Sequence, residues 1–235
     1  MKKYIVTFAL ALVFFLIANA PATLLTPYIK NINNLQVSDI HGSIWQGSLS
    51  SNHFEKLTWG INPLYLILGT LSADVNAKIN QTNHLNTTAS INLFRNTALE
   101  NINGTLTTNY LQQFAPTLPI MAQAKFAINN AQINWDDIKN QNIPSLAQGN
   151  ISIQKVNLLG EQLGNYDAKF NYQNNLLKSS IVSNASSKVN TNINLALNPQ
   201  FKFTIKGTIQ PITSNLKSIF KELNIPTKQD YSIQL

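Results

Sequence analysis

Cysteine is absent from this 235-residue chain, and charged residues are scarce. The lack of cysteine excludes disulfides and thiolate metal sites, although it does not by itself identify the cellular compartment. Charged residues make up 11% of the chain, against about a quarter in an average soluble domain. The 33 asparagines favour turns and polar strand faces over helix interiors. Disorder is excluded, because 44% of the residues are apolar and they alternate regularly with polar ones.

Arginine is almost absent as well, since Arg95 is the single arginine. The net charge of +7 comes from lysines that are scattered one by one along the chain. A protein that follows a nucleic-acid backbone normally shows clusters of arginine and lysine together with stacking aromatic residues. We therefore expect no nucleic acid as a partner. A mild excess of lysine suits contact with an anionic membrane surface better.

Recognisable catalytic motifs are missing too. His41, His53 and His84 do not have the spacing of metal ligands, and the chain lacks a nucleophile elbow, a phosphate-binding loop and a dinucleotide fingerprint. Asp39 with His41, or Asp136 with its neighbour Asp137, are the candidate acid/base pairs, but such polar stretches usually lie in solvent. We predict no enzyme activity, no metal and no cofactor. A serine hydrolase stays open as a distant alternative, because serine is plentiful.

Residues 1–25 carry a targeting signal. Lys2 and Lys3 precede an apolar run over residues 4–20. Roughly 17 to 20 apolar residues is the lower limit for crossing a bilayer, and it exceeds the usual core of a signal peptide. We therefore predict one N-terminal transmembrane helix that anchors the protein in the inner membrane, with Tyr4, Phe8, Leu12, Phe15 and Ile17 among its apolar residues.

A cleaved signal peptide is the alternative for the same segment. Small residues stand at cleavage spacing at Ala18 and Ala20, and again at Ala20 and Ala22, but Pro21 should impair cleavage at the first site. We therefore favour an uncleaved anchor. The two lysines at the start place the N-terminus in the cytoplasm and residues 26–235 on the far side of the membrane.

The remainder of the chain alternates apolar and polar residues with the period of a β-strand. Clear examples are residues 71–79, 87–93 and 120–128, followed by a turn predicted at Asn129 and Asn130. Residues 189–197 and 201–207 form a hairpin around an Asn-Pro-Gln turn. Short connections imply antiparallel pairing. We predict a mainly β domain over residues 26–235, an antiparallel meander or curved sheet.

A few short helices interrupt this β pattern. Residues 63–68 predict an apolar helical turn that begins at proline and ends at Gly69. A second turn is expected after Thr107 or Thr108. Near the C-terminus, Ser214 is the predicted cap of an amphipathic helix that reaches residue 223 and packs on the sheet. The alternative for that helix is contact with a membrane surface.

The most distinctive segment is Gly-Ser-Ile-Trp-Gln-Gly at residues 42–47. The glycines allow a bulge and a tight turn, while Trp45 and Trp59 close the end of a β core, because large aromatic residues in strands are mostly core residues. Direct contact with a partner is the alternative interpretation. The residues that carry this motif are Gly42, Trp45, Gly47, Trp59, Pro63 and Gly69.

With an N-terminal anchor in front of it, this motif resembles the type II secretion system protein N family. The similarity continues at the C-terminal end, in Gly207-x-Ile209-x-Pro211 and the helix that follows, where Asn224 replaces an expected glycine. The resemblance implies an inner-membrane component with one span and a periplasmic β domain. Such a component is expected to act in the assembly or operation of the machinery that exports folded proteins across the outer membrane of a Gram-negative envelope. It further implies no enzyme activity, and other type II secretion subunits as partners.

An envelope protein that binds or transfers lipid, similar to the AsmA-like proteins, is the second interpretation. In such a protein a curved sheet holds acyl chains in an apolar groove. The two interpretations differ in one apolar face, which would form an open trough for lipid or a covered core for a structural role. The positions that decide are Ala73, Val75, Ala77, Ala122, Ala124 and Phe126.

Overall fold

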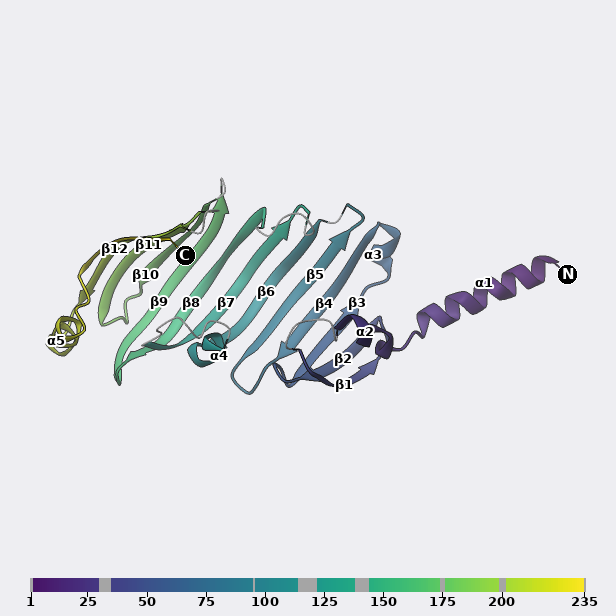
Figure 1. The fold of residues 1–235 in the computed structure, drawn as a ribbon, viewed down its shortest axis with the longest axis horizontal. Coiled ribbons are helices and arrows are strands. Elements are labelled where there is room, and N and C mark those ends of the chain that lie inside the picture. Colours follow the sequence, from purple (N-terminus) through teal and green to yellow (C-terminus); the bar gives the residue numbers. More distant parts are fainter. Residues whose placement is uncertain are drawn as a thin grey trace.

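One antiparallel sheet makes up most of the protein. The computed structural model describes residues 2–29, 35–94, 96–113, 122–137, 144–173, 176–198 and 202–234. These residues form 13 strands, and each strand pairs with its neighbours in sequence, so the order in the sheet is the order in the chain (Figure 1). The strands are β1 (Val37–Gly42), β2 (Gln46–Ser51), β3 (Lys56–Ile61), β4 (Thr70–Lys78), β5 (His84–Asn92), β6 (Thr97–Thr107), β7 (Ala122–Trp135), β8 (Leu146–Leu158), β9 (Glu161–Gln173), β10 (Leu176–Ser183), β11 (Val189–Leu197), β12 (Lys202–Pro211) and β13 (Lys228–Gln234).

The helices are few, and all but the first are short. The predicted β meander with short helices is therefore confirmed, and so is the hairpin of β11 and β12, in which Leu197 pairs with Phe203. Residues 199–200 of the expected Asn-Pro-Gln turn lie outside the described residues. The helical elements are α1 (Lys2–Ala18), a 3₁₀ turn η1 (Ala22–Leu25), α2 (Thr26–Ile29), α3 (Leu64–Ile67), α4 (Thr108–Gln112) and α5 (Ser214–Glu222).

The prediction of a turn at Asn129 and Asn130 is wrong, because β7 runs through both residues. Asn130 adopts a left-handed backbone with φ of 49°, and the register with β8 shifts there. The Asn130 N–H donates to Oδ1 of Asn103 on β6 at 2.8 Å. Asparagine tolerates this conformation, so the residue forms a β-bulge that re-aims the strand without ending it.

At the C-terminal end of the sheet, α5 covers an apolar cluster that we call the distal core. Leu216 is fully buried and Phe220 is 6% exposed, and both contact side chains from the strands below. The expectation that this helix packs on the sheet is thus confirmed. The buried members of the distal core are Val156, Leu158, Leu163, Tyr166, Val189, Leu216 and Phe220.

The ends of α5 show why the helix has these limits. Its N-cap is Thr213, with an extended backbone, so the prediction that Ser214 caps it is wrong by one residue. At the other end, Asn224 takes φ of 50°, and the Ile225 N–H donates to the Phe220 carbonyl at 2.9 Å. This is the Schellman arrangement, in which a left-handed residue ends the helix. Asparagine adopts that conformation at modest cost, which explains how it can replace glycine.

The opposite end of the sheet has a smaller apolar cluster, the proximal core, formed by Ala22, Leu49 and Trp59. Leu25 and Ile29, from η1 and α2, pack against it. η1 and α2 come shortly after α1 in the chain. The segment after the N-terminal helix therefore packs on the first strands (Figure 1).

The N-terminal helix α1 extends away from the sheet (Figure 1). It is 17 residues long and carries no charge after Lys3, and side chains such as Tyr4, Phe8 and Phe15 are exposed. In the described part of the chain, no helix reaches the combination of length and apolarity needed to cross a membrane.

The apolar positions that were to distinguish an open lipid trough from a covered core have intermediate exposure. They are half-buried, so they form neither a closed core nor a fully open trough. A lipid groove along the sheet gains no support from them. The positions are Ala73, Val75, Ala77, Ala122, Ala124 and Phe126.

Candidate functional site at the motif corner

The motif at residues 42–47 forms the corner between β1 and β2. Gly42 pairs with Gly47 across the two strands, and the Ser43 N–H donates to the Gln46 carbonyl at 2.9 Å. Gly42 has φ of +90°, and a Cβ atom there would collide with the Gln46 carbonyl oxygen. The corner therefore requires glycine at this position for two reasons, conformation and space.

Trp59 lies across this corner from the neighbouring strand β3. Its side chain is buried, and its ring occupies the space that a Cβ atom of Gly47 would need. The indole Nε1–H donates to the Ile44 carbonyl at 3.1 Å. The absence of a side chain at Gly47 thus lets the tryptophan seal the corner while its polar atom stays satisfied.

Trp45 has a different role, because it connects the corner to α1. Its side chain is half-buried, and its indole Nε1–H donates to the Ile17 carbonyl at 2.8 Å. The last carbonyls of a helix have no partner within the helix. The Ile17 carbonyl accepts the Ala20 N–H at 3.2 Å, and Trp45 adds a second donor from 28 positions further along the sequence.

Backbone contacts strengthen the same connection. The Ile44 N–H donates to the Ala20 carbonyl at 2.9 Å, and Pro21 forms an isolated antiparallel bridge with Ser43. Asn19 ends α1 by donating from its side chain to the Phe15 carbonyl at 2.8 Å. The motif corner therefore holds the end of α1 against the sheet.

Pro63 and Gly69 delimit α3, the apolar turn between β3 and β4. Pro63 is the N-cap residue, and the Asn62 side chain accepts the Leu64 N–H at 3.0 Å. Gly69 ends the turn with φ of +73°, and its carbonyl accepts the Leu93 N–H at 3.1 Å. The predicted apolar turn is confirmed, and the turn after β5 lies beside it.

A cleft of about 500 Å³ lies between α3 and the motif corner. The described residues that line it are all apolar, and they include both motif tryptophans. The structure thus brings four of the six motif residues together at one corner, namely Gly42, Trp45, Gly47 and Trp59, while Pro63 and Gly69 mark the start and the end of α3. The lining residues are Leu25, Ile44, Trp45, Trp59, Ile61, Leu66, Leu71 and Ala73.

The candidate acid/base pairs lie elsewhere and in solvent. Oδ2 of Asp39 is 2.6 Å from Nε2 of His41 on the outermost strand β1, and both side chains are more than half exposed. Asp136 accepts a hydrogen bond from the Ser145 hydroxyl at 2.9 Å, also at an exposed position. Among the described residues, no three metal-ligating side chains lie together. These geometries are those of surface polar pairs.

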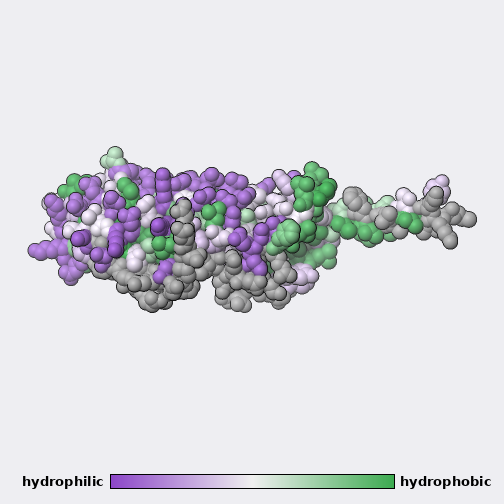
Figure 2. All heavy atoms as spheres, turned by 90° about the horizontal axis from the view of Figure 1, so that it is seen from above, coloured by the Kyte–Doolittle hydropathy of each residue, from purple (hydrophilic) through white to green (hydrophobic). Residues whose placement is uncertain are grey.

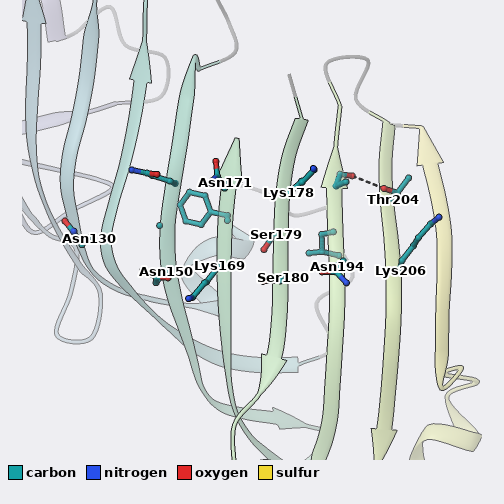
Figure 3. A pocket seen from close by; sticks show the side chains of 15 residues that line it. Asn130, Asn150, Lys169, Asn171, Lys178, Ser179, Ser180, Asn194, Thr204 and Lys206 are labelled. Carbon is teal, nitrogen blue, oxygen red and sulfur yellow. Dashed lines mark hydrogen bonds between the residues drawn. The ribbon is translucent and has the colours of Figure 1, made fainter. Parts of the chain in front are cut away.

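A second surface feature escaped the sequence analysis. Three lysines that are far apart in sequence, Lys169 on β9, Lys178 on β10 and Lys206 on β12, line a cleft of about 740 Å³ (Figure 3). The strand register produces this arrangement, since Lys169 pairs with Ser180, and Lys206 pairs with Asn194. The sequence alone does not give the register between β8 and β12, and therefore it does not show that these lysines lie together. The lysines are exposed, and we assign no ligand to this cleft.

Comparison with known proteins identifies one family. The model of type II secretion system (T2SS) protein N matches residues 33–232. No curated protein and no solved structure matches the chain. The match covers the whole sheet except for the last two residues of β13, and it includes the motif corner and α5. The chain therefore belongs to the type II secretion system protein N family.

Proposed function

We propose that the protein is a non-enzymatic component of the inner membrane in a type II secretion system, with α1 as its membrane anchor and residues 26–235 in the periplasm. The family match over residues 33–232 carries this proposal, because it identifies a type II secretion component. Membership of this family also implies contact with other components of the system. The membrane location is proposed from the length and apolarity of α1, and the non-enzymatic role from the exposure of the candidate acid/base groups.

The length and composition of α1 suit a membrane anchor. At 1.5 Å per residue, the 17 residues of α1 extend about 25 Å. The hydrocarbon core of a bilayer is about 30 Å thick. Local thinning of the bilayer offsets this mismatch. The lysines at the start then lie at the cytoplasmic surface.

The absence of enzyme activity is proposed from the character of the polar groups. The two acid/base candidates are surface groups, since both side chains of the Asp39–His41 pair are more than half exposed and Asp136 lies at an exposed position. Catalytic groups usually occupy concave sites where their pKa values are shifted. The two tyrosines with raised pKa values, Tyr110 and Tyr166, owe the shift to burial alone.

The two edges of the sheet are the proposed contact sites for other secretion subunits. In the described part of the chain, β1 pairs with β2 alone and β13 with β12 alone. The outer side of an edge strand presents N–H and C=O groups that can pair with a strand from another chain. Strand addition therefore offers a physical route for assembly.

Photo-crosslinking in cells tests this proposal. A photoreactive residue replaces Ser38 on β1 or Lys228 on β13, and Asn76 on the interior strand β4 serves as the matched exposed control. We expect adducts with other type II secretion subunits from one or both edge positions and none from the control. Equal adducts from all three positions, or the absence of any secretion subunit, would contradict the proposal.

A further inference from the structure

A large apolar surface remains uncovered at the end of the sheet from which α1 extends. The side chains at its centre are Ile67, Leu93 and Phe94, each 82% exposed, and Leu68, which is 76% exposed. We call this surface the apolar patch and define it as Leu64, Leu66, Ile67, Leu68, Leu93 and Phe94. Contiguous apolar surface of this kind marks a binding site for protein or membrane.

The patch is continuous across two turns of the chain. α3 supplies Leu64, Leu66 and Ile67, its C-cap residue is Leu68, and the turn after β5 supplies Leu93 and Phe94. The Leu93 side chain lies next to Gly69, and its N–H donates to the Gly69 carbonyl at 3.1 Å. The two turns thus form one surface with fixed geometry, and none of its six residues carries a charge.

The position of the patch relates it to α1. Figure 1 shows α3 at the same end of the sheet as α2 and the root of α1. Figure 2 shows hydrophobic side chains gathered at this end and continuing into α1, while hydrophilic side chains dominate the rest of that face. The hydrogen bonds of Trp45 with Ile17 and of Ile44 with Ala20 hold the root of α1 in this relation.

We propose that the apolar patch inserts into the membrane interface beside α1 and orients the sheet on the periplasmic surface of the bilayer. The inference rests on the proposed function, because it requires α1 to lie in the membrane. Since α1 alone is shorter than the hydrocarbon core, the bilayer surface has to reach the segment after it. That segment includes the exposed side chains of Leu24 and Tyr28, which lie at the same end of the sheet as the patch.

The chemistry of the patch and its surroundings fits a lipid surface. Exposed leucine, isoleucine and phenylalanine side chains partition into the boundary between headgroups and acyl chains. Trp45 lies at the root of α1 with an apolar ring and one satisfied polar atom, which is the character of residues found at membrane interfaces. The apolar cleft between Trp45 and Leu66 opens at the same end and would be covered in that arrangement.

Spin labels on the protein in vesicles test this inference. Because the chain has no cysteine, each label can be attached at one introduced cysteine. Single cysteines replace Ile67 and Phe94 in the patch, Phe15 in α1, and Ile212 as an exposed apolar control beyond the distal core. The full chain is reconstituted in vesicles of phosphatidylethanolamine and phosphatidylglycerol. Collision of each label with oxygen, which concentrates in lipid, is compared with collision with a water-soluble nickel chelate. Melting of each variant is measured to show that it folds.

We expect a higher ratio of oxygen to nickel collisions at positions 15, 67 and 94 than at 212. A lipid-like ratio at 15 with water-like ratios at 67 and 94 would overturn the inference and leave the proposed anchor intact. Loss of collisions with both reagents at 67 and 94 would overturn it as well, because the patch would then be covered by a second copy. A water-like ratio at 15 would refute the anchor itself, and the inference with it.

Discussion

The two ends of the sheet use short helices in opposite ways. At the distal end, α5 buries Leu216 and Phe220 against the strands, and its lysines face away from the core. At the proximal end, α3 consists of apolar residues only and leaves most of them exposed. An amphipathic helix can satisfy both the core and the solvent, whereas a turn that is apolar all round cannot. The distal helix therefore covers its apolar residues within the chain, whereas the proximal turn leaves most of its apolar residues exposed.

The largest effect is expected from emptying the proximal core. Trp59→Ala should lower the free energy of unfolding by about 3 to 5 kcal/mol, because the cavity left by a buried aromatic ring is only partly filled by relaxation. Denaturant unfolding followed by circular dichroism measures this change. Loss of secretion with unchanged unfolding would instead show that Trp59 contacts a partner.

A matched pair of leucines tests the contrast between the two helices directly. Leu216→Ala should destabilise the domain by about 2 to 5 kcal/mol, since Leu216 is fully buried. Leu64→Ala removes the same atoms from an exposed site and should change the stability by less than about 0.5 kcal/mol. Both values come from the same unfolding experiment. Similar losses for the two variants would show that α3 is packed against the rest of the chain.

The distal core should also be sensitive to alkaline pH. Burial raises the pKa of Tyr166 to about 12, above its ordinary value near 10. The folded protein therefore holds this proton more tightly than the unfolded chain, and the resulting stability is complete below pH 10 and is lost as the pH rises toward 12. Unfolding measured on both sides of pH 10 should show this loss. Tyr166→Phe should reduce the slope, and an unchanged slope would contradict the assignment.

A smaller effect is expected at the junction between α1 and the sheet. Trp45→Phe keeps an aromatic ring but removes the donor to the Ile17 carbonyl, at a cost of about 1 kcal/mol. Distances between spin labels on α1 and on β4 should become more widely distributed in this variant. Trp59→Phe is the matched control. It removes the hydrogen bond to the Ile44 carbonyl, which lies within the corner and does not involve α1. Equal broadening in both variants would argue against a specific tether at Trp45.

Much of the sheet could be predicted from the sequence, because period-2 alternation is a local property of each strand. The limits of β4 and β11 fall within a residue or two of the predicted ranges. The bulge at Asn130 could not be predicted, since asparagine pairs also form turns and the choice depends on the Asn103 side chain of another strand. The grouping of Lys169, Lys178 and Lys206 around one cleft depends on the register between strands, which the sequence does not encode locally.

The motif shows the same division between local and distant information. Its glycines and Trp59 were predicted to form a corner with a buried aromatic ring, and the structure places them so. Trp45 was expected in the core, yet it is half-buried and bonded to α1. The tryptophan finds its partner 28 residues earlier in the chain, and this pairing depends on where α1 ends.

The contrast between the two ends can be measured most directly by hydroxyl-radical footprinting of the protein in native membranes. Leu68 and Phe94 at the proximal end are compared with Val182 and Ile212, which are exposed elsewhere on the sheet. If a surface outside the chain covers the proximal end, Leu68 and Phe94 are protected while Val182 and Ile212 are oxidised. Equal oxidation of all four side chains would contradict the account.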